Sequence, residues 1–533
     1  MSLRPRRLAL AAVLVGLLTS VPALAQDLLH QQTREGQLVA DGAWCWFQDP
    51  RAVHHVGLHD RTYIGFVTSK GDVEIASQDA RTSQLAVSVI HARLQKDDHA
   101  SPGIVVQPDG RIGVFYSKHT GKDLLFRVST RPEDVTSFGP ERVVAHTGSS
   151  AGMTYGNPIY LPAENRTYVF FRGGTSRPTV TWSDDGMKTW APARTMVTPS
   201  GTYRSARPYV KYATNGWDTI LMSFTDGHPR NEPHDSVYTM TLRGGLFRTV
   251  NGLVLASLEG TKKGVAALPV KLASVPRLYN GSGPDGKAWV WSTAFDLKGN
   301  PVVAFATFPS DRDHRYWYAH WTGTAWVTRQ FARAGGSIAA SGDEPDYSGG
   351  MDLDPSDPST LYASREIAGQ WELEKWHTPD GGLTWDRPVP LTAHSRVRQV
   401  RPVVPWGPPG DVKVLWMAGR YDSWDDGYNT ALEELTTGPS PTTLTATAPR
   451  AVQRKSPIAV TGRLIRGNGG RPLVGGVVSL SLHGVQLASS ATDEHGDFYL
   501  ATPGLLSGDY TVHYSGDKEW GQATSAPLHV AVQ

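Results

Sequence analysis

Short runs of alternating apolar residues, separated by turns, fill most of this chain and limit the folds that it can adopt. Residues 62–67, 220–224 and 412–416 are typical runs, and Pro-Asp-Gly at 108–110 and Asn-Gly at 215–216 are typical turns. No helical period persists over a useful length. The 55 glycines and 37 prolines in 533 residues suit a chain with many turns. The sequence therefore predicts an all-β fold, for which radially repeated four-stranded sheets offer more room than one sandwich.

One turn motif occurs twice and indicates a β-propeller. Residues 378–385 (TPDGGLTW) match the S/T-x-D-x-G-x-T-W turn called an Asp box, and residues 183–190 (SDDGMKTW) match it with Met187 at the usual Gly position. In such a turn the carboxylate holds backbone amides, and the Trp packs between neighbouring sheets. We therefore expect structural roles for Asp185 and Asp380, away from the functional site.

The first 25 residues have the pattern of a secretory signal peptide. Three arginines at positions 4, 6 and 7 precede an apolar run at 8–18, and Ala-Leu-Ala at 23–25 forms a small-x-small cleavage site. No later run is long and apolar enough to span a bilayer. The sequence predicts an exported protein, extracellular or periplasmic, without membrane insertion. A net charge of +2 with scattered basic residues gives no reason to expect a nucleic-acid partner.

The chain contains a single cysteine, Cys45, which excludes an intrachain disulfide. Its position between Trp44 and Trp46 favours a buried, small apolar residue over a nucleophile. Cys45 lacks the cysteine partners of a typical zinc cluster, whereas His or Asp ligands stay open.

The composition of the sequence changes near residue 436, which indicates a second domain. Residues 27–437 form the expected propeller, residues 438–447 a Pro/Ser/Thr-rich linker, and residues 448–533 an immunoglobulin-like β-sandwich. The acidic turn at 493–497 could bind calcium, although an ordinary solvated turn is the simpler interpretation. We expect no chemistry in the C-terminal domain.

Between residues 97 and 173, four polar clusters lie at the ends of β-like runs. They contain His99, His119, Tyr155 and Arg172. Strands that converge can aim such side chains at one point. A guanidinium then binds a carboxylate as a fork, and an imidazole or a phenol moves the neighbouring proton. For each residue alone, the alternative is an ordinary polar strand end.

Several of these motifs together resemble a known family. They lie at residues 44–53, 97–99, 116–119, 155–158, 170–173 and 225–230. The set is similar to that of the BNR-4 repeat propellers that include ulvan lyases and rhamnose–glucuronate lyases. The resemblance covers most of residues 40–435 and no part of the C-terminal domain. It implies a seven-bladed propeller that binds an acidic polysaccharide and eliminates across a uronate.

The resemblance also implies roles for individual residues. His99 and His119 correspond to the family's histidine pair, Tyr155 to its tyrosine and Arg172 to its arginine. The division of base and acid stays open. A phenol is a poor base at neutral pH unless a cation lowers its pKa, as Arg172 and His119 could do. The implied substrate-binding residues are Arg230, His228 of the same turn and, more weakly, Tyr209.

The expected function is therefore a secreted lyase that leaves an unsaturated uronate end on a rhamnose/glucuronate type of polymer. No cofactor is required for this chemistry, a structural calcium or zinc ion stays open, and we expect a monomer. A sialidase-like glycoside hydrolase is one alternative, since Arg51, Arg172, Arg230 and Arg365 supply arginines, but a sialidase-type Arg-Ile-Pro start is missing. A non-catalytic carbohydrate-binding propeller is the other, because the 17 tryptophans offer faces for sugar rings.

Overall fold

A computed structural model shows an all-β protein, as the sequence predicts. It describes residues 34–147, 152–198, 207–260, 264–339, 344–425, 427–467, 471–517 and 519–533. These ranges contain β-strands and three short 3-10 helices, η1 (Asp98–Ala100), η2 (Pro162–Glu164) and η3 (Leu272–Ser274), and no α-helix. None of the helical segments in them is long and apolar enough to cross a bilayer. The signal peptide expected at 1–25 lies outside the described residues.

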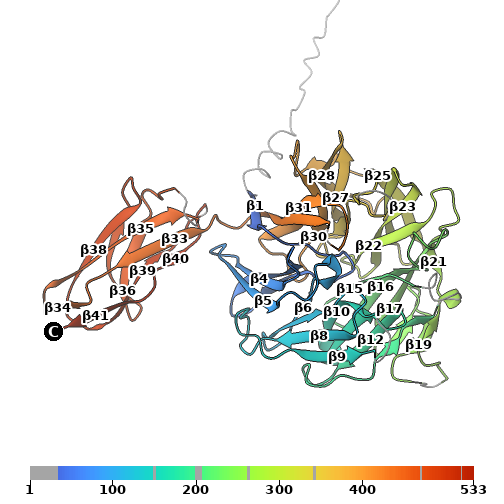
Figure 1. Ribbon diagram of the computed structural model, residues 1–533, viewed down its shortest axis with the longest axis horizontal. Helices are drawn as coiled ribbons and strands as arrows, with labels where there is room; N and C mark the ends of the chain where they lie inside the picture. Colours follow the sequence, from blue (N-terminus) through green and yellow to red (C-terminus); the bar gives the residue numbers. More distant parts are fainter. Residues whose placement is uncertain are drawn as a thin grey trace, which may run out of the picture.

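Six antiparallel sheets follow one another along the described part of residues 52–390, placed side by side in the larger lobe (Figure 1). Apart from one added strand in the fourth sheet, each sheet consists of strands that are consecutive in the chain and so forms a local meander. In order, the sheets are β2–β5 (Ala52–Val56, Asp60–Val67, Val73–Asp79, Leu85–His91); β6–β9 (Gly103–Val106, Ile112–Tyr116, Asp123–Val128, Arg142–His146); β10–β13 (Thr154–Leu161, Arg166–Arg172, Pro178–Ser183, Arg194–Thr195); β15–β19 (Val210–Thr214, Thr219–Thr225, Val237–Arg243, Leu246–Arg248, Val254–Ser257) with β21 (Arg277–Tyr279); β22–β25 (Ala288–Phe295, Pro301–Ser310, Asp313–Trp321, Trp326–Gly335); and β26–β29 (Met351–Leu353, Thr360–Ile367, Gln370–His377, Val389–Pro390). A parallel pair, β14 (Val197–Thr198) and β20 (Val270–Lys271), joins two of them.

The seventh sheet combines the two ends of the lobe. Strands β30 (Arg398–Val403), β31 (Val412–Tyr421) and β32 (Tyr428–Thr436) are completed by β1 (Arg34–Val39), which pairs with β32 in antiparallel register. The first described strand thus closes the last sheet, as in a ring. The assignment of these sheets as seven propeller blades stays a prediction, as do the domain boundaries.

The segment between β1 and β2 fills the middle of the larger lobe with aromatic side chains. Trp46 stacks on Trp291 with a centroid distance of 4.4 Å, and Phe47 packs against Trp289. Cys45 is 1% exposed, so the expectation of a buried cysteine is confirmed. This close-packed apolar core provides rigid support for the polar residues of the candidate site.

Both Asp boxes have the structural role that the sequence predicts. The carboxylate of Asp185 accepts hydrogen bonds from the amides of Lys188 and Thr189, and Asp380 accepts one from the amide of Thr384. Trp190, which ends the first box, packs edge-on against Phe115 of the preceding sheet. The boxes therefore join neighbouring sheets.

The C-terminal part forms a second lobe of two sheets (Figure 1). One sheet has the order β33-β35-β38 and the other β34-β41-β39-β36-β37, with β40 on β39. Their bounds are β33 Thr442–Thr447, β34 Ala451–Val452, β35 Pro457–Arg466, β36 Val477–Leu482, β37 Val485–Ala491, β38 Asp497–Pro503, β39 Gly508–Tyr514, β40 Ala523–Thr524 and β41 Leu528–Val532.

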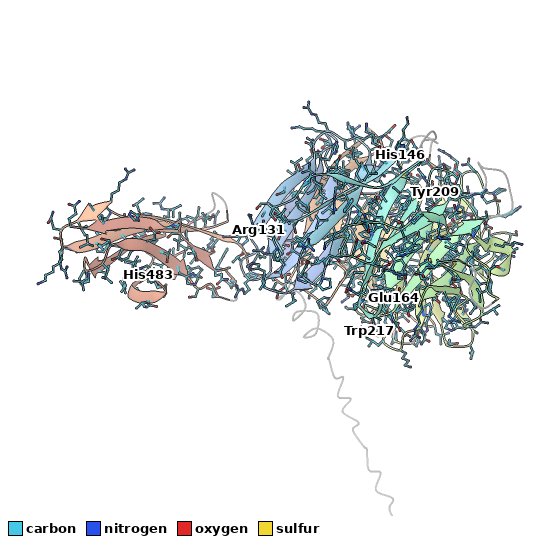
Figure 2. The ribbon with its side chains drawn as sticks, turned by 90° about the horizontal axis from the view of Figure 1, so that it is seen from below. Arg131, His146, Glu164, Tyr209, Trp217 and His483 are labelled. Atoms are coloured by element: carbon cyan, nitrogen blue, oxygen red, sulfur yellow. The ribbon has the colours of Figure 1, made fainter. Side chains whose placement is uncertain are left out.

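Apolar side chains from both sheets of this lobe form one core, with Ile458, Leu480 and Val512 among them. Figure 2 shows His483 in this lobe, far from Tyr209 of the larger one. Strand β33 begins at Thr442, inside the segment 438–447 that the sequence analysis treats as a linker. An immunoglobulin-like identity for this sandwich stays a prediction.

Candidate active site

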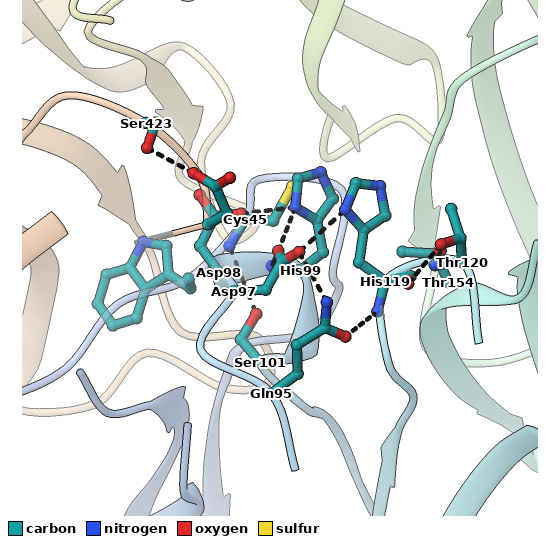
Figure 3. Close-up of polar contacts among 12 residues, drawn as sticks. Cys45, Gln95, Asp97, Asp98, His99, Ser101, His119, Thr120, Thr154 and Ser423 are labelled. Atoms are coloured by element: carbon teal, nitrogen blue, oxygen red, sulfur yellow. Dashed lines mark hydrogen bonds and ion pairs between the residues drawn. The ribbon is translucent and has the colours of Figure 1, made fainter. Parts of the chain in front are cut away.

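Two histidines from neighbouring segments stack on each other at the centre of the candidate site. His99 lies in η1, and His119 follows β7. Their rings are 4.0 Å apart and nearly parallel, at 4°. The buried carboxylate of Asp97 joins them, because one oxygen accepts from His99 Nδ1 at 2.7 Å and the other from His119 Nδ1 at 2.9 Å (Figure 3). Both rings therefore have their Nδ1 atoms engaged and their Nε2 atoms available.

A second carboxylate, that of Asp98, lies behind the histidine pair. Its Oδ1 is 2.8 Å from His99 Nδ1. Its Oδ2 accepts a hydrogen bond from the Tyr421 hydroxyl at 2.6 Å and forms an ion pair with Arg401. Asp98 is completely buried and Arg401 is 1% exposed. Arg401 and Tyr421 were not predicted as site residues, because no local sequence pattern marks them.

Tyr155 and Arg172 enter the site from β10 and β11. Tyr155 has a positive φ of 65°, and the pairing of β10 with β11 is irregular between Thr154 and Asn157. This conformation, uncommon for a residue other than Gly, places the phenol ring 5.5 Å from that of His99. The Arg172 guanidinium lies over the Tyr155 ring at 5.1 Å. The four residues predicted as catalytic are thus brought together.

The guanidinium of Arg172 is held on several sides. Its Nη1 donates to the Tyr209 hydroxyl at 3.1 Å, its Nη2 to Thr154 Oγ1 at 2.8 Å, and its Nε to the Gly152 carbonyl at 3.4 Å. These contacts use three of the five N–H donors of an arginine. Among the described residues no partner takes the other two donors, one on each terminal nitrogen, so these can serve a ligand. Tyr209 belongs to the site through its contact with Arg172.

The turn with His228 and Arg230 borders the same cluster. The ring of His228 packs edge-on against Tyr209 at 5.3 Å. Glu344 joins the two residues of the turn, since its carboxylate lies 2.9 Å from Arg230 Nη1 and 3.5 Å from His228 Nε2. Burial raises the pKa of Glu344 to about 7. Glu344 was not predicted as a site residue, because it lies in no recognisable motif.

The two histidines have opposite charge preferences. Burial alone would lower the pKa of His99, but the surrounding groups, including Tyr155, Asp97 and Asp98, raise it well above its ordinary value. Burial and the positive charge of His99 lower the pKa of His119 to about 4. At neutral pH, His99 is therefore a cation and His119 a neutral base.

The protonation state of Tyr155 differs from the one considered in the sequence analysis. Burial raises the pKa of the Tyr155 hydroxyl well above its usual range, and this effect exceeds the opposing charges of His99 and Arg172. The neighbouring cations therefore do not turn the phenol into a base. His119 also cannot act as a cation on Tyr155, because it is neutral. In the unliganded site, Tyr155 is a proton donor.

Two groups of side chains in the described ranges bring possible metal-binding atoms within 4.8 Å of one another: Cys45 with Asp98 and His99, and Asp97 with His99 and His119. In the second group Asp97 accepts a hydrogen bond from each imidazole, and in the first group Asp98 Oδ1 forms an ion pair with His99 Nδ1. The arrangement is thus complete as an acid–base cluster. The calcium or zinc ion considered from the sequence stays a prediction.

Comparison with known proteins identifies the family of this chain. A profile of the BNR repeat-containing family (BNR_4) matches residues 61–334, just over half of the chain. The curated protein "Ulvan Lyase-PL25" from Pseudoalteromonas sp. (strain PLSV) is 24% identical over 332 residues. That match spans 52% of this chain and 63% of the relative, which is less than two thirds of the relative's length.

Solved structures show the same fold. The PL25 ulvan lyase, alone and bound to -[GlcA(1-4)Rha3S]-, aligns with a TM-score of 0.56 at 19% identity. The alignment covers 76% of this chain and 96% of the lyase chain. The segment that the family profile matches contains His99, His119, Tyr155 and Arg172. The resemblance noted from the sequence motifs is confirmed: the chain belongs to the BNR repeat-containing family.

Proposed function

We propose that this protein is a polysaccharide lyase that cleaves a uronate-containing polymer by β-elimination. The observation that carries this proposal is a single cluster of four side chains. It joins the neutral imidazole of His119 and the phenol of Tyr155 to two cations, His99 and Arg172. Membership of the family and the likeness to an ulvan lyase support it. We further propose that the substrate is of the rhamnose/glucuronate type. We also propose that the protein is exported from the cell, which the signal-like N-terminal sequence supports.

Arg172 and His99 bind the uronate carboxylate. The two remaining donors of the Arg172 guanidinium form a fork that fits a carboxylate. His99 adds a second positive charge, and its Nε2 is available because Asp97 and Asp98 engage Nδ1. Both cations act most strongly when charge develops on the carboxylate oxygens as the C5 proton leaves. They therefore stabilise the transition state more than the bound substrate.

His119 takes the C5 proton and Tyr155 protonates the leaving oxygen. Nδ1 of His119 donates to Asp97, so its Nε2 has the lone pair that accepts the proton. The electrons of the C5–H bond form a C4=C5 double bond as the C4–O bond breaks. The glycosidic oxygen receives the proton of the Tyr155 hydroxyl, and the phenolate recovers a proton from His119 before the next turnover. No water is consumed, so a glycosidase carboxylate pair is unnecessary.

The experiment that tests this function is a screen of uronate polymers for an ultraviolet-absorbing unsaturated product. A hydrolase releases reducing ends without this absorbance, and a lectin releases nothing. Elimination by the wild-type protein supports the proposal, and cleavage or binding without the absorbance contradicts it.

Variants connect the activity to the cluster. We expect His119→Ala and Tyr155→Phe each to lower kcat by about 100-fold or more, and the double variant to be little worse than the poorer single one. His146→Ala is the matched control, because the His146–Asp123 pair has the same type of Nδ1–carboxylate contact, at 2.6 Å, on the surface. Losses that multiply would show independent binding contacts instead of one acid–base unit.

A further inference from the structure

We propose that Arg401 and Tyr421 are positioning residues that act on His99 through Asp98. They belong to β30 and β31 of the seventh sheet, whereas His99 lies between the first and second sheets. The kinetic part of this inference rests on the proposed lyase function. The geometric part does not.

The three groups behind His99 form a closed triangle of contacts. Tyr421 donates its hydroxyl proton to Asp98 Oδ2 at 2.6 Å, and Arg401 Nη2 donates to the Tyr421 oxygen at 2.6 Å. Arg401 Nη1 completes the triangle with an ion pair to the same Asp98 oxygen. The other Asp98 oxygen faces His99 Nδ1 at 2.8 Å. None of the three side chains is more than 1% exposed, so water cannot replace any of these contacts.

The charges in this region explain why Arg401 is needed. Asp97 and Asp98 are adjacent buried carboxylates, and the groups that face His99 from the packed elements are these two acids, Cys45, Tyr155 and the neutral His119. His99 alone offers one positive charge for two carboxylates. Arg401 supplies the second from the opposite side. Burial alone would raise the pKa of Asp98, but Arg401 and His99 hold it below its usual value. Asp98 therefore stays charged and holds the His99 ring through the ion pair at Nδ1.

The backbone of Arg401 shows that this placement is built into the strand. Arg401 has a φ of 54°, in the left-handed region, and the pairing of β30 with β31 shifts register between Val400 and Val403. Such an irregularity re-aims a side chain relative to the strand face. The carbonyl of Arg401 accepts from Trp44 Nε1 at 3.0 Å, and Arg401 Nη1 donates to the Trp44 carbonyl at 2.9 Å. Trp44 therefore holds Arg401 both at its backbone carbonyl and at its guanidinium.

Tyr421→Phe is the test, and Tyr428→Phe is its matched control. The two tyrosines face each other across β31 and β32, and both are at least 98% buried. Each hydroxyl donates one hydrogen bond, but that of Tyr428 goes to the Thr68 carbonyl at 3.1 Å instead of Asp98. We expect Tyr421→Phe to lower kcat about 10- to 100-fold with a smaller change in KM, since a hydrogen bond to a charged group is lost. Tyr421→Phe should also lower the Tm more than Tyr428→Phe, because the Tyr421 oxygen accepts from Arg401 as well as donating to Asp98.

A substitution at Arg401 separates charge from packing. Arg401→Lys keeps the positive charge and should retain more activity than Arg401→Met, although neither replaces both contacts. Equal losses in the two would show that Arg401 only fills space and would overturn its electrostatic role.

A nuclear magnetic resonance measurement tests the geometry without any substrate. Protein labelled with 15N in its histidine rings should show a shifted His99 signal in Tyr421→Phe and an unchanged one in Tyr428→Phe, with His99→Gln to assign the signal. If the wild type cleaves no uronate polymer, the proposed function fails while the ring signal still decides the positioning role. If the wild type is active, and Tyr421→Phe matches its control in both kinetics and ring signals, the inference is wrong.

Discussion

Elimination by this protein should persist at pH values where an ordinary histidine base is already protonated. A base works only in its neutral form, and burial together with the charge of His99 lowers the pKa of His119 to about 4. The ordinary value is about 6.5. The sign follows directly: kcat/KM should fall as the pH drops through about 4, because His119 gains its proton there.

The size of the effect can be worked out at pH 5, where an ordinary histidine is mostly protonated. With a pKa of about 4, roughly 90% of His119 is neutral at pH 5, whereas a pKa of about 6.5 would leave about 3%. The two cases differ by about 30-fold at pH 5, but by less than about 1.5-fold at pH 7. A comparison of kcat/KM at pH 5 and pH 7 therefore decides between them.

The assay follows the absorbance of the unsaturated uronate at low substrate concentration, where initial rates report kcat/KM and the free protein. Tryptophan fluorescence at each pH serves as the control for folding. The pKa of His99 is raised by the surrounding groups, so its positive charge should persist to a higher pH than that of an ordinary histidine, and the activity with it. An acid limb of kcat/KM centred near pH 6.5 in folded protein would refute the assignment of His119 as the buried base.

The remaining predictions concern single groups and the second lobe. Arg172→Lys should lose most of kcat/KM at nearly unchanged Tm, because a point ammonium cannot provide the fork; near wild-type kinetics would make Arg172 a purely structural residue. His99→Gln should move the acid limb of the residual activity to higher pH, since the His99 cation is one cause of the low pKa of His119; a limb that stays near pH 4 would contradict this coupling. Ending the chain at residue 440, before β33, should leave elimination intact, because every candidate residue precedes it; a folded but inactive product would show otherwise. Asp380→Ala should lower the Tm and leave kcat/KM unchanged, because its hydrogen bonds hold only the turn at 380–384.

The sequence was informative wherever a local pattern carried the information. Alternation of apolar residues predicted the strands, and the Asp boxes predicted that Trp190 packs against a neighbouring sheet. His119 and Arg172 were found because each lies at or just after the end of a strand. The meeting of these strand ends follows from the arrangement of consecutive sheets.

What the sequence could not show depends on contacts between distant segments. Arg401 lies 303 residues from Asp98, and no sequence pattern near position 401 indicates a contact with η1. Glu344 lies 114 residues from Arg230, also beyond the reach of any local pattern. The role of Tyr155 stayed open in the sequence, because the cost of burying a charge depends on all surrounding atoms and not only on the two nearest cations.

The pairing of β1 with β32 has a consequence for the order of folding. Arg34 lies opposite Thr436, so the ring can close only after almost the entire larger lobe has been synthesised. Such a distant contact is slow to form, because a long loop must be ordered before the contact contributes any stability. Until then both β1 and β32 present unpaired edges, which are sites for association with other chains. A chain interrupted anywhere before residue 436 would keep that open edge permanently, and we expect it to aggregate instead of folding.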